Sequence, residues 1–171
     1  MNLQDHIRIV PNFPKEGINF YDISTLLKHP AAWRLAVSRL CTMAEAYQPD
    51  LIMGIESRGF LVAAPMAHEM GIGFGMIRKK GKLPGATLSH KYSLEYGEDE
   101  IEIQPDLVPA GARVVIVDDL LATGGTMHAS EELIHKSGAK VIANLAIIEL
   151  EGLDGRAKLN SSFEALLNCP A

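Results

Sequence analysis

The segment from Val114 to Thr126 constrains the fold more than any other part of the chain. It begins with the β-branched run Val114–Val117, continues with the adjacent carboxylates Asp118 and Asp119, and ends in a turn of small residues. A short apolar run of this kind is typical of a strand buried on both faces of a sheet, and the turn has the composition that opens a helix. The segment therefore predicts a strand–loop–helix unit.

The same alternation of strands and helices recurs along the chain. Apolar residues at three- and four-residue spacing predict helices at 30–46, 59–70 and 125–136. Short apolar runs predict strands at 51–55, 73–77, 113–117 and 141–148. Alternating strands and helices imply right-handed crossovers, so we predict one α/β domain over residues 1–171, with a largely parallel central sheet flanked by helices. Residues 150–171 are too weakly periodic for an assignment.

Residues between Lys79 and Pro109 depart from this pattern. The segments 88–96 and 100–104 alternate polar and apolar residues and are joined by Gly97-Glu98-Asp99, which is typical of an exposed antiparallel hairpin. We therefore expect a mobile flap over about residues 79–105.

Charge and composition exclude several classes of protein. The 171 residues include 16 Lys and Arg against 21 Asp and Glu, a formal net charge of −5, which disfavours nucleic acid or a membrane as a partner. Neither the two cysteines, Cys41 and Cys169, nor the six histidines show the spacing of a metal site. We therefore expect a cytoplasmic protein that binds no metal ion directly.

The loop after the two acids has the chemistry of a phosphate site. Ligands of parallel sheets bind beyond the carboxyl ends of the strands, where Asp118 and Asp119 lie. The five residues that follow offer backbone N–H groups, two hydroxyls and a helix N-terminus, which favour a phosphate monoester. Those residues are Ala122, Thr123, Gly124, Gly125 and Thr126.

This segment closely resembles the phosphoribosyl-pyrophosphate (PRPP) loop of type I phosphoribosyltransferases, in which two acids and a Thr/Gly-rich loop follow an apolar strand. The resemblance implies the type I phosphoribosyltransferase fold. It also implies that Asp118 and Asp119 bind the ribose hydroxyls and that residues 122–126 bind the 5′-phosphate. Because Mg²⁺ prefers oxygen ligands and keeps its waters, it would arrive bound to the substrate, near the two acids.

A second cluster is cationic. Arg78, Lys79, Lys80 and Lys82 lie within five positions and precede Leu83-Pro84-Gly85. Such a run is commonly a solvated face. It also resembles the segment that leads into the catalytic loop of adenine phosphoribosyltransferases, which implies that Arg78, Lys79 and Lys82 bind pyrophosphate.

The segment Glu56-Ser57-Arg58-Gly59-Phe60 follows the first predicted strand of the alternation. Alone it is a weak signal, but it resembles the pyrophosphate loop of the same family. The resemblance implies that Glu56, Ser57 and Arg58 bind pyrophosphate, that Arg58 takes part in catalysis, and that a cis peptide joins Glu56 to Ser57.

Two further segments resemble the adenine-specific members of the family. Residues 93–97 resemble the catalytic-loop motif, which implies that Glu95 is the acid/base for the purine proton; a plain surface glutamate in an acid-rich flap is the alternative. Residues 13–23 resemble the base-recognition hood, here about residues 1–25, although Phe-Tyr-Asp replaces the more usual Phe-Arg-Asp. The resemblance implies that the base is bound by Asn19, Phe20, Tyr21 and Leu120, with an ordinary core aromatic as the alternative for Phe20.

Together these resemblances imply an adenine phosphoribosyltransferase of purine salvage. Such an enzyme converts adenine and PRPP to AMP and pyrophosphate with substrate-bound Mg²⁺, and members of the family are typically homodimers. One alternative is a transferase for hypoxanthine, guanine or xanthine. Another is a PRPP-sensing regulator without catalysis, which keeps the fold but would leave Glu95 and the lysine-rich loop unexplained.

Overall fold

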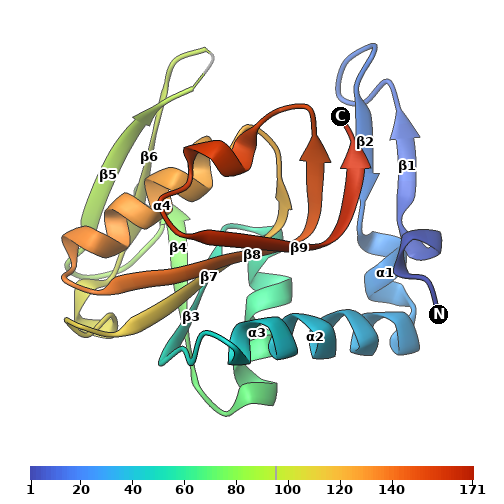
Figure 1. Ribbon diagram of the computed structural model, residues 1–171. Helices are drawn as coiled ribbons and strands as arrows, with labels where there is room; N and C mark the ends of the chain where they lie inside the picture. The colour runs from blue at the N-terminus through green and yellow to red at the C-terminus, as the bar shows by residue number, and fades with distance from the viewer. Residues whose placement is uncertain (95) are drawn as a thin grey trace.

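The computed structural model describes residues 1–94 and 96–171 (Figure 1). Among these residues, seven strands form the main sheet in the order β5-β6-β4-β3-β7-β8-β9. They are β3 (Leu51–Ile55), β4 (Gly73–Lys79), β5 (Leu88–Ser93), β6 (Glu98–Ile103), β7 (Arg113–Leu121), β8 (Lys140–Glu151) and β9 (Ser162–Pro170). The five strands from β4 to β9 in this order pair in parallel, whereas β6 pairs antiparallel with both β4 and β5. The predicted parallel sheet with an antiparallel flap is thus confirmed.

The remaining elements cover the sheet or precede it. The helices are α1 (Ser24–Lys28), α2 (Pro30–Glu45), α3 (Arg58–Met70) and α4 (Gly125–Lys136). Short 3₁₀ helices are η1 (Leu3–His6), η2 (Pro105–Leu107) and η3 (Gly155–Lys158), and β1 (Arg8–Pro11) pairs with β2 (Asn19–Asp22) in a separate hairpin. In the described part of the chain, every helix falls short of the length and apolar character needed to cross a bilayer.

The core has two layers, one on each face of β7. Val115 and Val117 pack with apolar residues of α2 and α3, whereas Val114 and Ile116 pack with α4. Figure 1 shows α4 on one side of the sheet and α2 with α3 on the other. Because strand side chains alternate between faces, a run that is apolar at every position must be covered on both sides.

Several strands are longer than their apolar runs predicted. β7 continues to Leu121 because β8 runs alongside it, with Asp118 opposite Ala146 and Leu120 opposite Ile148, so both acids belong to the strand. β4 continues to Lys79 because β6 pairs with its end. In the flap, the predicted turn at Gly97-Glu98-Asp99 is wrong, since β6 begins at Glu98.

Residues 150–171, which the sequence left unassigned, form the end of β8, η3 and the edge strand β9. Within β9 Phe163 and Cys169 are the buried residues, so the strand lacks the apolar alternation that signals a half-buried strand. Parallel pairing with β8 determines its conformation.

The hood residue that departs from the family pattern is a core residue. Tyr21 is 6% exposed, and its hydroxyl donates a hydrogen bond to the carbonyl oxygen of Pro170 over 2.6 Å. The side chain therefore ties the N-terminal hairpin to the end of β9, which lie beside each other in Figure 1.

Replacing this tyrosine should weaken the fold. Tyr21→Phe keeps the ring but leaves the Pro170 carbonyl without its donor, so we expect the free energy of unfolding to fall by about 1 kcal/mol. Urea denaturation measures it. Tyr96→Phe, at a residue that is 84% exposed, is the control and should leave the midpoint unchanged. Equal midpoints for Tyr21→Phe and the wild type would contradict the role of this bond.

Candidate active site

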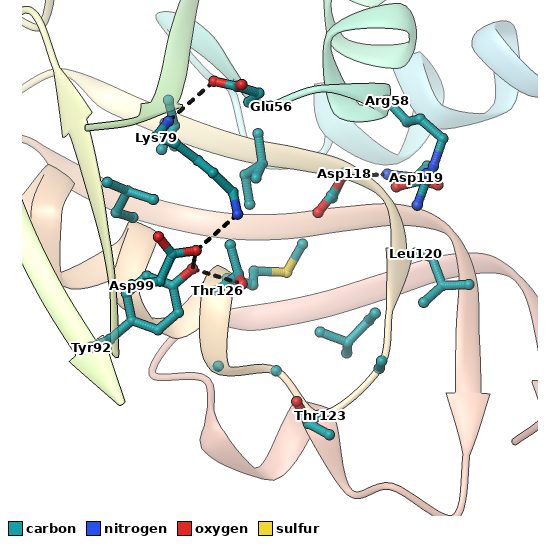
Figure 2. Close-up of a pocket in the computed structure, with 18 of the residues that line it drawn as sticks. Glu56, Arg58, Lys79, Tyr92, Asp99, Asp118, Asp119, Leu120, Thr123 and Thr126 are labelled. Carbon is teal, nitrogen blue, oxygen red and sulfur yellow. Dashed lines mark hydrogen bonds and ion pairs between the residues drawn. The ribbon is translucent and has the colours of Figure 1, made fainter. Parts of the chain in front are cut away.

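A cavity of about 560 Å³ opens where β3, β4 and β7 end and where α3 and α4 begin. Most of the residues expected at the site line it (Figure 2): Glu56, Ser57, Arg58, Arg78, Lys79, Asp118, Asp119, Leu120, Ala122, Thr123, Gly124, Gly125 and Thr126. Segments far apart in sequence meet there because parallel strands bring their carboxyl ends to one edge of the sheet.

The loop between β7 and α4 forms one end of the cavity. Gly124 has a φ of +81°, a left-handed conformation that glycine adopts without strain, and α4 begins at the next residue. The first N–H groups of a helix have no partner within it, and hydroxyls are added by Thr123 of the loop and Thr126 of the first turn of α4. The loop thus provides the donors that a phosphate monoester needs.

The two adjacent acids have different surroundings. Asp119 lies on the face of β7 that packs against α3, and its carboxylate accepts a hydrogen bond from Arg58 Nε over 2.6 Å. Asp118 lines the cavity, where it accepts the N–H of Asp119 over 2.8 Å. Enclosure raises the pKa of Asp118 well above its ordinary value, and the Asp119 carboxylate adds to the shift.

The close approach of α3 to β7 requires a glycine. A Cβ on Gly59 would lie 2.9 Å from the carbonyl oxygen of Val117 and 3.0 Å from Asp118 Oδ1, distances that side chains do not tolerate. Gly59 therefore lets the first turn of α3 reach the end of β7, which places Arg58 beside Asp119.

Glu56 holds the cationic cluster together. Its Oε1 accepts hydrogen bonds from Arg78 Nε over 3.0 Å and from the Lys79 N–H over 3.1 Å, and its Oε2 accepts one from Lys82 Nζ over 2.9 Å. Burial opposes ionisation, but these donors keep the pKa of Glu56 below its ordinary value. A carboxylate repels pyrophosphate, so this geometry fits Glu56 for positioning the cations. The expected cis peptide between Glu56 and Ser57 is present.

Two flap residues that sequence analysis missed also line the cavity. Tyr92 Oη lies 3.1 Å from Thr126 Oγ1 and 3.4 Å from Asp99 Oδ2, and the same Oδ2 lies 3.0 Å from Lys79 Nζ (Figure 2). Tyr92 and Asp99 are opposite each other in the β5–β6 register. Correct placement of the hairpin turn would have paired them.

The hood residues Asn19, Phe20 and Tyr21 are outside the lining of this cavity. Phe20 lies next to Arg58, which lines the cavity and whose guanidinium carbon is 5.5 Å from the centre of the Phe20 ring. Glu95, the expected acid/base, lies outside the described residues. Among the residues that are described, no cluster of three or more His, Cys, Asp or Glu could hold a metal ion.

The sheet order, the loop after β7 and the paired acids are those expected of the type I phosphoribosyltransferase fold. The chain belongs to the phosphoribosyltransferase family, because residues 23–161 match the model of the phosphoribosyl transferase domain.

Its relatives identify the branch of that family. The adenine phosphoribosyltransferase of Acidiphilium cryptum is 59% identical over 168 residues, 98% of each chain, and that of Rhodospirillum rubrum is 56% identical over 98% of each. Two solved structures are also similar. The adenine phosphoribosyltransferase of Thermoanaerobacter pseudethanolicus has a TM-score of 0.94 and 46% identity, over 98% of this chain and 100% of that one. The adenine phosphoribosyltransferase of Saccharomyces cerevisiae, in complex with adenine and an imino-altritol bisphosphate, has a TM-score of 0.92 and 40% identity, over 96% of each chain.

The raised pKa of Asp118 makes its charge costly to the fold. As pH rises above about 3.8, the unfolded chain loses this proton before the folded protein does. The free energy of unfolding therefore falls as pH rises from about 3.8 to the higher pKa that Asp118 has in the folded protein. Asp118→Asn keeps an oxygen acceptor but removes the charge. We therefore expect the variant to be more stable than the wild type at pH 7, by about 1 kcal/mol.

Urea denaturation between pH 4 and pH 8 measures this difference, which should shrink toward pH 4. Asp106→Asn, at an exposed acid of η2, is the control and should follow the wild-type curve. A gain in Asp118→Asn that is the same at every pH would show that the charge is not its cause.

Proposed function

We propose that this protein transfers the 5-phosphoribosyl group of PRPP to adenine, producing AMP and pyrophosphate in purine salvage. One observation carries the proposal: a single cavity is lined by a phosphate loop, a pair of acids, and Arg78 and Lys79 beside Glu56, with Lys82 bound to Glu56 outside the lining. PRPP has the matching order of a 5′-phosphate, ribose hydroxyls and a pyrophosphate. Relatives named adenine phosphoribosyltransferase, similar along nearly the whole chain, support adenine as the base.

The residues of the cavity fit the steps of this reaction. Residues 122–126 bind the 5′-phosphate while Asp118 and Asp119 bind the ribose hydroxyls. A purine nitrogen then forms a bond to ribose C1′ as the bond from C1′ to the pyrophosphate oxygen breaks. Positive charge develops on the ribose and negative charge on the leaving group, so catalysis comes from positioning and electrostatic stabilisation.

The cations and the flap complete the site. Arg58, Arg78, Lys79 and Lys82 stabilise the leaving pyrophosphate, with the Glu56 carboxylate holding Arg78 and Lys82 in position. Glu95 accepts the proton that the purine gives up. Closure of the flap over the cavity would exclude water from this step.

The hood and Leu120 bind the base. The ring of Phe20 stacks on the purine, and the backbone at Asn19 and Tyr21 reads its edge, because an exocyclic amine needs an acceptor and a ring nitrogen needs a donor. The buried side chain of Tyr21 supports a contribution through the backbone rather than through the phenol.

Magnesium enters this proposal with the substrate. The carboxylates of Asp118 and Asp119, which line the cavity, would hold the ion through its water ligands. The ion would neutralise charge on the pyrophosphate. A homodimer and a cytoplasmic location rest on the resemblance and on the cysteine spacing, and both stay predictions.

The direct test is pyrophosphate release from PRPP and Mg²⁺, with adenine, hypoxanthine, guanine, xanthine and orotate offered separately. We expect turnover with adenine at least about 100-fold faster than with any other base, because a site built for hydrogen-bonding groups rejects bases that leave them unpaired. Asp119→Asn, which removes the charge that Arg58 contacts, should lower kcat/KM for PRPP at least tenfold. A different preferred base would refute adenine, and PRPP binding without turnover would favour the regulator.

Tyr92 offers a test of the flap contact. Tyr92→Phe removes the hydroxyl that touches Thr126 and keeps the ring, so we expect KM for PRPP to rise about fivefold, the value of one ordinary hydrogen bond, with KM for adenine little changed. Steady-state kinetics in both substrates measures the split. Tyr47→Phe is the matched control, because it removes a phenol that donates to Glu164 over 2.6 Å, outside the cavity lining. Equal KM values for PRPP in Tyr92→Phe and Tyr47→Phe would show that the Tyr92 hydroxyl does not contribute to PRPP binding.

A further inference from the structure

The segment after β8 lies in direct backbone contact with the phosphate loop. A Cβ on Gly155 would lie 2.2 Å from the carbonyl oxygen of Ala122 and 3.1 Å from Leu121 Cγ. From the other side, a Cβ on Gly124 would lie 2.3 Å from the carbonyl oxygen of Gly155. Neither position can carry a side chain unless one backbone moves away from the other.

Glycine is required at position 155 because the phosphate loop lies so close, and not because of the backbone conformation of Gly155 itself. Gly155 begins η3 with a φ outside the left-handed region, so an alanine there would be unstrained in the absence of the loop. Gly152, three residues earlier, is the opposite case: its φ is +87° and no atom lies within 4 Å of its Cβ position. Gly152 is therefore required by the left-handed conformation of its turn, whereas Gly155 is required by the contact with the phosphate loop.

Two sets of hydrogen bonds hold the segment that carries Gly155. Arg156, the next residue, donates from its Nε to Glu149 Oε1 of β8 over 2.7 Å. Further along, the fully buried carboxylate of Glu131 accepts the N–H of Asn160 over 2.8 Å and the N–H of Ser161 over 2.9 Å. Glu131 belongs to α4, the helix that the phosphate loop opens. The segment therefore bridges β8 and α4, the two neighbours of that loop.

We propose that Gly155 is a positioning residue of the phosphate site, and that the segment Gly152–Ser161 sets the loop geometry on which affinity for the 5′-phosphate depends. The inference rests on the proposed role of residues 122–126. It assigns a function to a part of the chain that none of the sequence motifs includes. Gly155 acts through the backbone of Ala122 and Gly124 and has no contact with substrate in this role.

The physical reason is the steep dependence of hydrogen bonds on geometry. Several N–H groups of one loop must converge on the same phosphate, and each bond weakens sharply as its angle falls toward 120°. A Cβ at position 155 would lie 2.2 Å from the Ala122 carbonyl oxygen. One of the two backbones must therefore move by more than 1 Å before the two atoms are at an ordinary contact distance. A displacement of about 1 Å in a binding element costs about 100-fold in catalytic sites, so a tenfold loss of affinity is a conservative expectation.

The test uses ribose 5-phosphate and pyrophosphate as separate probes in isothermal titration of the full-length protein. For Gly155→Ala we expect the Kd for ribose 5-phosphate to rise at least tenfold and the Kd for pyrophosphate to stay within twofold of the wild type. Gly73→Ala is the matched control: its Cβ would lie 3.1 Å from Leu51 Cδ1, at the other end of the parallel strands, and both constants should be unchanged. A merely structural role for Gly155 would affect both probes alike.

A milder variant keeps the test decisive if Gly155→Ala does not fold. Arg156→Gln acts on a side chain that is 54% exposed and loosens the attachment of η3 to β8, so we expect about threefold weaker binding of ribose 5-phosphate alone. Wild-type affinity for ribose 5-phosphate in both variants, or equal losses for both probes, would overturn the proposal. Selective loss of ribose 5-phosphate in a protein that turns over no base would support it while refuting the proposed transferase activity.

Discussion

The structure depends on one strand, β7, which is covered on both faces, paired on both edges as far as Val117 and paired on one edge as far as Leu121. Parallel pairing with β3 stops at Val117, but pairing with β8 continues to Leu121, and this extension carries Asp118 and Asp119 beyond the apolar core. α3 approaches the same point through Gly59, α4 begins after a loop of three residues, and η3 contacts that loop. Each of these elements would lose its position if the end of β7 frayed. The apolar run that identifies this strand in the sequence is therefore also what makes the cavity rigid.

The charges of the cavity are arranged at a cost to the fold. Arg58 compensates Asp119, and three donors compensate Glu56, but Asp118 is left with a raised pKa beside another carboxylate. A sequence selected for stability alone would place a neutral residue there. The arrangement becomes reasonable once a ligand with hydroxyl donors occupies the space, because those donors stabilise the ionised form of Asp118.

Sequence alone located the three longer helices and most of the sheet but not α1, because apolar periodicity over several turns is a local signal that a five-residue helix lacks. It also identified most of the residues that meet in the cavity, since motifs that follow parallel strands converge by topology. Strand ends were missed because they depend on pairing: Asp118 and Lys79 are polar residues held in strands by β8 and β6. Tyr92 was missed because the hairpin turn was misplaced, and β9 because an edge strand with few buried residues has no clear period. Gly155 has no local signal, since its neighbour in space is 31 positions away in sequence, at Gly124.

The phosphate loop is contacted from two sides by interactions of different kinds. On the flap side, the hydroxyl of Tyr92 touches Thr126, and a hydroxyl pair can exchange its partners when an anion arrives. On the other side, the backbone of Gly155 touches Ala122 and Gly124, and a contact between two main chains cannot be exchanged without moving the segment. The fixed contact lies in the part of the chain anchored by the buried Glu131, whereas the exchangeable one lies on the hairpin that also carries Asp99 and contacts Lys79. On the proposed function, this division would let the loop keep a constant shape while the flap responds to what the loop binds.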